Sequence, residues 1–287
     1  MSVTANGTDA GSGDGTVAQA LARAGAAGLE RLDAQLLLLS ALGRDRQDRA
    51  WLITHDDAPL PAPVRRRFDA LCARRLEGEP LAYLVGEKEF FGMTLQVDAR
   101  VLVPRPDTET LVEWALELLA ARSRPRIIDL GTGSGAIALA LQRACPDAFV
   151  QAVDRSAEAL SVARDNARRL ELPLHLRQAC WLEEDAGGWD LIVANPPYIA
   201  AGDPHLPALR HEPVSALVAG PDGLDDLRRI AQAAPTQLAP GGWLLLEHGW
   251  DQAAAVRDLL RSAGFVQVAS RRDLGGVERC SGGRLET

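Results

Sequence analysis

The sequence contains no run of about 18 consecutive apolar residues, so it predicts no membrane-spanning helix. No basic stretch followed by an apolar run opens the N-terminus, which argues against a secretory signal peptide. Cysteine is also scarce, and the four that occur lack the C-x-x-C spacing of zinc sites and redox motifs: Cys72, Cys145, Cys180 and Cys280. These absences predict a protein of the reduced cytoplasm.

Basic residues are fewer than acidic ones: the sequence has 31 Lys and Arg and 39 Asp and Glu, for a net charge of -8. Dedicated nucleic-acid binders neutralise phosphates with clustered Lys and Arg, so we expect no direct nucleic-acid substrate. The histidines show neither metal-ligand spacing nor a Ser-His-Asp arrangement, and we expect no metal; they are His55, His175, His205, His211 and His248.

The 287 residues suffice for two domains, and 47% hydrophobic content is typical of packed globular proteins. Residues 1–15 hold almost no large apolar side chains and are predicted to be a disordered tail.

We expect a small helical domain over residues 16–87. Its first helix starts after Thr16, is closed by Gly43 and carries one apolar face made of Leu29, Leu32, Leu36 and Leu39. A second helix, residues 64–77, carries an arginine run that we interpret as a solvated face.

Residues 88–103 mix aromatic and β-branched residues around Gly92, which predicts a β-hairpin linking two domains. A helix is expected from about Thr108 to Ala121, with Asp107 or Thr108 as its N-cap. The remaining chain, within a domain of residues 104–287, alternates strands and helices. That alternation is typical of a mainly parallel α/β sheet covered on both faces. The expected strands are 127–130, 149–153, 174–178, 191–194, 243–247 and 265–270, with an antiparallel edge strand within 276–285.

A glycine-rich turn, Gly131-Thr132-Gly133-Ser134-Gly135, follows the first of these strands and precedes a helix. Glycines let a ligand approach the backbone closely, and the helix N-terminus offers free N–H groups. Nicotinamide and flavin sites use similar loops with an acid about 20 residues later, and Asp154 fits that pattern as well. Asp129 favours a donor with a cationic amino acid portion.

The turn Asn195-Pro196-Pro197-Tyr198 follows a buried strand, at the sheet edge where α/β proteins bind ligands. The two prolines lack N–H groups, which leaves neighbouring carbonyls free to accept. The Asn195 side-chain oxygen and a proline carbonyl can take both hydrogens of a planar nitrogen, and Tyr198 can stack on its plane. These four residues do not distinguish a nucleobase from a glutamine amide as the acceptor.

Together the two motifs resemble amino methyltransferases that use S-adenosylmethionine. Further segments narrow the resemblance to the HemK (PrmC) type of release-factor glutamine methyltransferases, over roughly residues 16–287. These segments are Pro80 to Gly86, Glu89 to Gly92, Val103 to Glu109, Asp203 to Leu206, Ala219 to Leu224 and Glu247 to Gly249.

The resemblance implies a Rossmann-like, seven-stranded class I methyltransferase domain preceded by a helical substrate-binding domain and a linking hairpin. It implies S-adenosyl-L-methionine as donor and the glutamine of the Gly-Gly-Gln motif in bacterial class 1 release factors as substrate. Donor contacts would come from Gly131, Thr132, Gly133, Ser134, Gly135, Asp154, Trp181 and Asn195. Substrate contacts would come from Arg105, Asn195, Pro196, Pro197 and Tyr198, of which Asn195, Pro196 and Tyr198 would be catalytic.

Three alternatives stay open at this point. The acceptor could be a glutamine of a ribosomal protein, although the Pro-Arg-Pro segment at 104–106 favours release factors. It could be adenine or cytosine of a nucleic acid, against which the acidic balance argues. The chain could also be an inactive donor-binding module, against which the intact Asn195 and Tyr198 argue.

Overall fold

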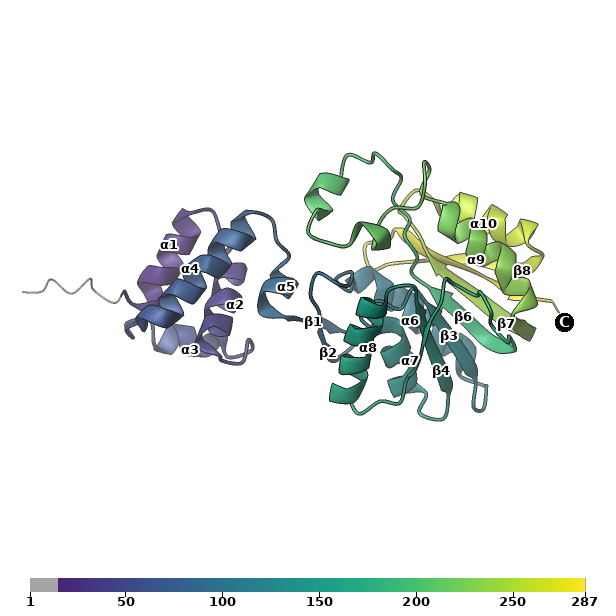
Figure 1. The fold of residues 1–287 in the computed structure, drawn as a ribbon, viewed down its shortest axis with the longest axis horizontal. Helices are drawn as coiled ribbons and strands as arrows, with labels where there is room; N and C mark the ends of the chain where they lie inside the picture. The colour runs from purple at the N-terminus through teal and green to yellow at the C-terminus, as the bar shows by residue number, and fades with distance from the viewer. Residues whose placement is uncertain (1–14, 287) are drawn as a thin grey trace, which may run out of the picture. The chain divides into compact units, whose positions relative to one another are not determined.

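The computed structural model describes residues 15–286, so the expected disordered tail lies outside it except for Gly15 (Figure 1). The chain divides into two compact units, with the division between Val85 and Gly86.

The first unit is helical. Its helices are α1 (Val17–Ala26), α2 (Arg31–Leu42), α3 (Arg49–Thr54), α4 (Ala62–Leu76) and α5 (Leu81–Val85). Thr16 begins α1 with a capping box, in which its hydroxyl accepts from the Gln19 backbone and the Gln19 side chain accepts from the Thr16 backbone. Gly43 closes α2 in the left-handed conformation at φ 67°, as predicted.

Two details of the predicted first helix are wrong. The chain turns at Gly28, with φ 96°, so two helices stand where one was expected. The apolar face also differs, because Leu32 is 50% exposed while Leu37 and Leu38 are fully buried. A run of adjacent leucines permits several faces, and packing of α2 against α4 selects which of them is buried.

The arginines of α4 divide into two groups. Arg66 and Arg67 are exposed, as a solvated face requires. Arg75 instead pairs with Asp33 of α2 at 2.6 Å, and Arg74 pairs with Glu79 at 2.5 Å. Part of the arginine run therefore stabilises the helical unit.

The second unit begins with a two-stranded hairpin, β1 (Glu87–Phe90) and β2 (Met93–Gln96). It is shorter than expected, and residues 97–103 form no strand. Asn166 of α8 (Ala157–Arg169) holds β2 in place: its Oδ1 accepts from the Gln96 N–H at 2.7 Å and its Nδ2 donates to the Gln96 carbonyl at 3.0 Å. The hairpin is thus hydrogen-bonded to a helix of its own unit.

A seven-stranded sheet forms the body of this unit, in the order β5-β4-β3-β6-β7-β9-β8. Its strands are β3 (Arg126–Leu130), β4 (Phe149–Asp154), β5 (His175–Gln178), β6 (Trp189–Ala194), β7 (Leu238–Glu247), β8 (Phe265–Arg272) and β9 (Glu278–Leu285). The five strands from β5 to β7 are parallel, whereas β9 runs antiparallel to both of its neighbours.

The expected antiparallel edge strand is therefore an inner strand, and β8 forms the edge. Small residues explain the placement of β9, because a Cβ added at Gly282 would lie 2.3 Å from Leu245 of β7. Glycine is what this crowded interior position requires.

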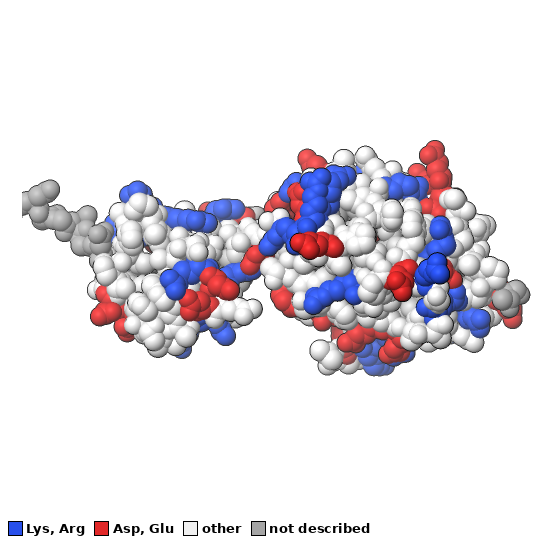
Figure 2. All heavy atoms as spheres, turned by 90° about the horizontal axis from the view of Figure 1, so that it is seen from below, with Lys and Arg blue, Asp and Glu red and all other residues white. Residues whose placement is uncertain are grey.

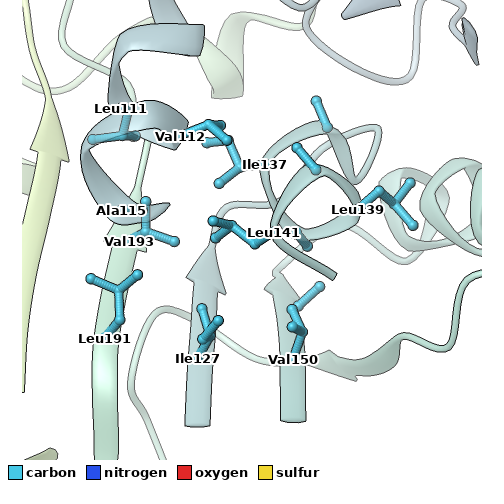
Figure 3. Close-up of a cluster of buried hydrophobic side chains, with 14 of the residues drawn as sticks. Leu111, Val112, Ala115, Ile127, Ile137, Leu139, Leu141, Val150, Leu191 and Val193 are labelled. Carbon is cyan, nitrogen blue, oxygen red and sulfur yellow. The ribbon is translucent and has the colours of Figure 1, made fainter. Parts of the chain in front are cut away.

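Helices cover both faces of the sheet. On one face α6 (Glu109–Leu119) and α7 (Ala136–Ala144) pack on Ile127 of β3, Val150 of β4 and Leu191 of β6 (Figure 3). On the other, α9 (Asp225–Ala233) and α10 (Ala253–Ser262) pack on alternate residues such as Ile128 and Ile192. Burial on both faces explains the continuous apolar runs of these strands.

The described residues contain no helix long and apolar enough to cross a membrane. Within the same residues no group of His, Cys, Asp and Glu could hold a metal ion. The four cysteines form no disulfide.

Candidate active site

A cavity of about 220 Å³ opens at the carboxyl edge of the parallel strands, where open α/β sheets bind ligands. Its wall contains residues 131–134 after β3, residues 154–156 at the end of β4, and Asn195 after β6. Residues 99–102, Pro104, Arg105, Pro213, Ser215 and Ala216 also contribute, and all of these segments belong to the second unit.

The three glycines of the loop after β3 have positive φ, at 72° for Gly131, 55° for Gly133 and 83° for Gly135. A Cβ at Gly131 would lie 3.1 Å from Cζ3 of Trp181, so this glycine lets the indole pack on the loop. A Cβ at Gly133 would meet nothing within 4 Å. Gly135 does not line the cavity. It begins α7, and a Cβ there would lie 3.3 Å from Ala163 of α8.

Asp129 is fully buried beneath this loop. Its Oδ2 accepts from the Thr132 hydroxyl at 2.6 Å and from the Ala138 N–H at 3.2 Å. Burial raises the pKa of Asp129 to about 7. Asp129 is not part of the cavity wall. It holds the loop from below, and its Oδ1 has no hydrogen-bond partner among the described residues.

Asp154 ends β4 at the cavity. Its Oδ2 accepts from the Gly133 N–H at 3.0 Å and its Oδ1 accepts from the Ser156 N–H at 2.9 Å. Each carboxylate oxygen keeps a lone pair, so the group can also accept from a pair of hydroxyls such as those of a ribose. Trp181 lines the same wall, and its indole N–H donates to Asp226 at 3.2 Å, which orients the ring. These residues fit an adenosyl group.

Asn195 and Pro197 line the cavity from the side of β6, whereas Pro196 and Tyr198 do not. The Asn195 Nδ2 donates to the Thr108 hydroxyl at 3.3 Å. The Tyr198 hydroxyl donates to Glu247 Oε1 at 3.4 Å, and burial followed by the Glu247 charge raises the Tyr198 pKa. Tyr198 thus lies beside the cavity, with its hydroxyl directed to a buried carboxylate.

Glu247, the last residue of β7, is only 2% exposed. Burial raises its pKa to about 7, while a hydrogen bond from Thr108 opposes that rise. Its Oε2 has no hydrogen-bond partner in the part of the chain described. The sequence contained Glu247 within a matched segment but offered no role for it.

Arg105 lines the cavity and forms an ion pair with buried Glu212, whose Oε2 also accepts from the Val103 N–H at 3.1 Å. Arg155 donates to the Ser215 carbonyl at 2.7 Å. The loop after Tyr198 is therefore tied to both sides of the cavity.

Glu212 and Ser215 lie in irregular chain, where no periodicity marks them, and sequence reasoning missed them. Thr108 lies in the matched segment Val103 to Glu109 and was singled out only as a possible helix cap.

Comparison with known proteins agrees with this architecture. Residues 16–86 match the PrmC N-terminal domain, and residues 108–212 match the methyltransferase small domain. The release factor glutamine methyltransferase of Bordetella pertussis is 52% identical over 262 residues, which are 90% of this chain and 96% of that protein. The chain belongs to the release factor glutamine methyltransferase family.

A second family member, from Pseudomonas aeruginosa, is 50% identical over 258 residues, covering 88% of this chain and 92% of the relative. Among solved structures, a methyltransferase from Pyrococcus furiosus matches with a TM-score of 0.52 at 18% identity. That match covers 75% of this chain and 98% of the other, and it shows the fold alone. Within the family S-adenosyl-L-methionine supplies the methyl group, and this chain is a methyltransferase that uses it.

Proposed function

We propose that this chain methylates the side-chain amide nitrogen, N5, of the glutamine in the Gly-Gly-Gln motif of bacterial class 1 release factors. One observation carries the proposal: Asn195 and Pro197 open on the same cavity as Asp154 and the glycine loop. Residues that can bind a planar nitrogen therefore line the same cavity as residues that can bind an adenosyl donor. The names of the relatives support the same substrate.

On the donor side, residues 131–134 would surround the methionine portion and Asp154 would accept from the ribose hydroxyls. Trp181 would lie against the adenine. When bound, S-adenosylmethionine supplies a methyl group on a sulfonium, which is a good leaving group. Transfer therefore needs positioning of the acceptor more than a strong base.

On the acceptor side, the lone pair of an amide nitrogen is delocalised and is a poor nucleophile. The Asn195 side-chain oxygen and a proline carbonyl of the same turn would each accept one N–H of the glutamine amide. These two contacts hold the nitrogen and stabilise the positive charge that it gains during transfer. Arg105, on the cavity wall beside them, would contact the substrate backbone.

We further propose that residues 16–87 bind the release factor, that residues 88–103 link this helical domain to the methyltransferase domain, and that the enzyme acts in the cytoplasm. Tyr198 would support the glutamine from beside the cavity. Acidic balance disfavours a nucleic-acid acceptor, and Lys or Arg and Asp or Glu are interspersed on the face seen in Figure 2.

Incubation with labelled S-adenosylmethionine and a purified release factor tests the proposal. We expect one methyl group per release factor, placed by mass spectrometry on the Gly-Gly-Gln glutamine. A release factor with asparagine in place of that glutamine is the matched control and should remain unlabelled. Equal labelling of the control, or labelling of RNA or DNA instead, would overturn the assignment.

A further inference from the structure

The side chain of Gln252 joins three segments of the second unit and lies outside the cavity wall. Gln252 immediately precedes α10 and is half-buried. Its Oε1 accepts from the Gly249 N–H at 2.8 Å, in the segment that follows β7. Its Nε2 donates to the Tyr198 carbonyl at 3.0 Å and, less closely, to the Asp222 carbonyl at 3.4 Å. Both ends of the amide therefore have partners, and one of them is the last residue of the Asn-Pro-Pro-Tyr turn.

These partners fix the orientation of the Gln252 amide. A backbone N–H can only donate and a carbonyl can only accept, so the amide oxygen must face Gly249 and the amide nitrogen must face Tyr198. An ionised carboxylate of the same length has no donor for Tyr198, and a lysine has no acceptor for Gly249. A primary amide supplies both.

Two buried glycines leave room for this amide. A Cβ at Gly249 would lie 3.0 Å from Oε1 of Gln252. A Cβ at Gly223 would lie 2.8 Å from Nε2 of Gln252. One glycine thus lies against each end of the amide, so close packing as well as hydrogen bonding sets the position of the side chain.

The Asn-Pro-Pro-Tyr turn needs support from outside because of its two prolines. Pro196 and Pro197 have no N–H, so the turn cannot hold its shape through donors of its own. Its start is fixed by β6, which ends at Ala194. Among the described residues no backbone N–H donates to the Tyr198 carbonyl at its end. The Gln252 amide supplies the missing hydrogen bond.

We propose that Gln252 is a positioning residue, whose amide fixes the Tyr198 carbonyl and thereby the placement of Asn195 and the proline carbonyls against the substrate nitrogen. This inference rests on the proposed function for the identity of the acceptor. Gln252 does not line the cavity, so it acts through the turn and not on the substrate. Transfer is sensitive to placement, since a displacement of about 1 Å can lower a rate by about a hundredfold.

Removal of the amide nitrogen tests this role. Gln252→Glu keeps the length of the side chain and the acceptor for Gly249, but the ionised carboxylate cannot donate to Tyr198. We expect kcat with a release factor to fall by about tenfold to a hundredfold, and the Kd for S-adenosylhomocysteine to stay within about twofold. Asp251→Ala, which shortens the exposed neighbouring side chain, is the matched control and should keep both values.

Native kcat in Gln252→Glu would overturn the proposal. A structural role alone would lower Tm and weaken donor binding together with kcat, and that outcome would overturn it as well.

Gly249→Ala tests the same contact and leaves Gln252 in the sequence. The added methyl group would press on the Gln252 oxygen, so we expect kcat to fall. In a Gln252→Ala background, where the shortened side chain leaves room, Gly249→Ala should cause no further loss. Additive losses from the two changes would contradict the proposal, because they would mean that Gly249 acts independently of the amide.

A second measurement needs no substrate. The sequence has two tyrosines, and only Tyr198 is followed by isoleucine. Tyrosine labelled with ¹³C at its carbonyl carbon, combined with ¹⁵N-isoleucine, therefore gives one signal in a spectrum that correlates each carbonyl with the following amide. A carbonyl carbon moves upfield when it loses a hydrogen bond. We expect this shift for Tyr198 in Gln252→Ala and not in Asp251→Ala.

A Tyr198 carbonyl signal that stays unchanged in Gln252→Ala would overturn the positioning role. If instead the signal shifts as expected while the native enzyme leaves release factors unmethylated, the contact stands and the proposed substrate fails. The two failures are therefore distinguishable.

Discussion

Asp154 and Asn195 lie on opposite sides of one cavity and differ in what holds them. Both oxygens of Asp154 accept backbone N–H groups, from Gly133 and Ser156, so its position is set before any ligand arrives. Asn195 is held through its nitrogen by Thr108, which leaves its oxygen for a partner. The two residues should therefore respond differently to replacement.

Asn195→Ala should lower kcat by about a hundredfold or more while donor affinity changes little, because the lost acceptor matters most as charge develops. Asp154→Ala should raise the Kd for the donor by about tenfold or more, because two hydroxyls lose a charged acceptor. Single-turnover kinetics and equilibrium donor binding check both. Two variants that changed donor affinity alone would contradict these roles.

At the scale of elements, the loop between Tyr198 and α9 folds back onto the Asn-Pro-Pro-Tyr turn. The N–H of Ile199 donates to Leu217 at 2.9 Å, and the N–H of Ala219 donates to Ile199 at 3.0 Å. Gly223 makes the closest approach, because a Cβ there would lie 2.2 Å from the Tyr198 carbonyl oxygen. The loop therefore supports the turn through backbone contact.

Gly223→Ala should disturb the turn, since both the positive φ of 74° and the close approach exclude a side chain. Gly202→Ala in the same loop is the matched control: its φ is 91°, but a Cβ there would meet nothing within 4 Å. The control should cost about 1 kcal/mol, or roughly 2–4 °C in Tm, with turnover kept. Gly223→Ala should lower Tm further and reduce kcat. Equal behaviour of the two variants would count against backbone support.

How far these elements could be predicted depends on their burial. Strands covered on both faces, such as β4 and β6, have apolar runs that place them and the residues at their carboxyl ends, Asp154 and Asn195 among them. The position of β9 in the sheet could not be predicted, because its glycines are explained only by the neighbours they meet. Glu247 and Glu212 were missed for a related reason: their importance comes from burial among partners distant in sequence.

At the scale of the whole molecule, two buried carboxyl groups make the stability of the methyltransferase unit depend on pH. Burial raises the pKa of Asp129 from 3.8 to about 7 and that of Glu247 from 4.5 to about 7. A raised pKa means that the folded state binds the proton more tightly than the unfolded state. The resulting stabilisation is fully present below the unfolded pKa and is lost as pH rises through about 7.

We expect Asp129→Asn and Glu247→Gln each to flatten the decline in the free energy of unfolding between about pH 4 and 7. Denaturant titrations across this range measure the effect as a difference from the native protein. Asp203 and Asp222, whose pKa values are lowered, act in the opposite sense and mainly below about pH 4. Parallel curves for native and variant proteins would mean that these carboxyls do not titrate as described.

The inner position of β9 has a consequence for how the chain is made. Since β8 precedes β9 in the sequence, the ribosome delivers the outer strand first, and β7 keeps an open edge until β9 arrives. Open strand edges invite pairing with other chains. The nascent chain should therefore be prone to aggregate during this interval, and residues 278–285, although they lie outside the cavity wall, protect it by covering the edge of β7.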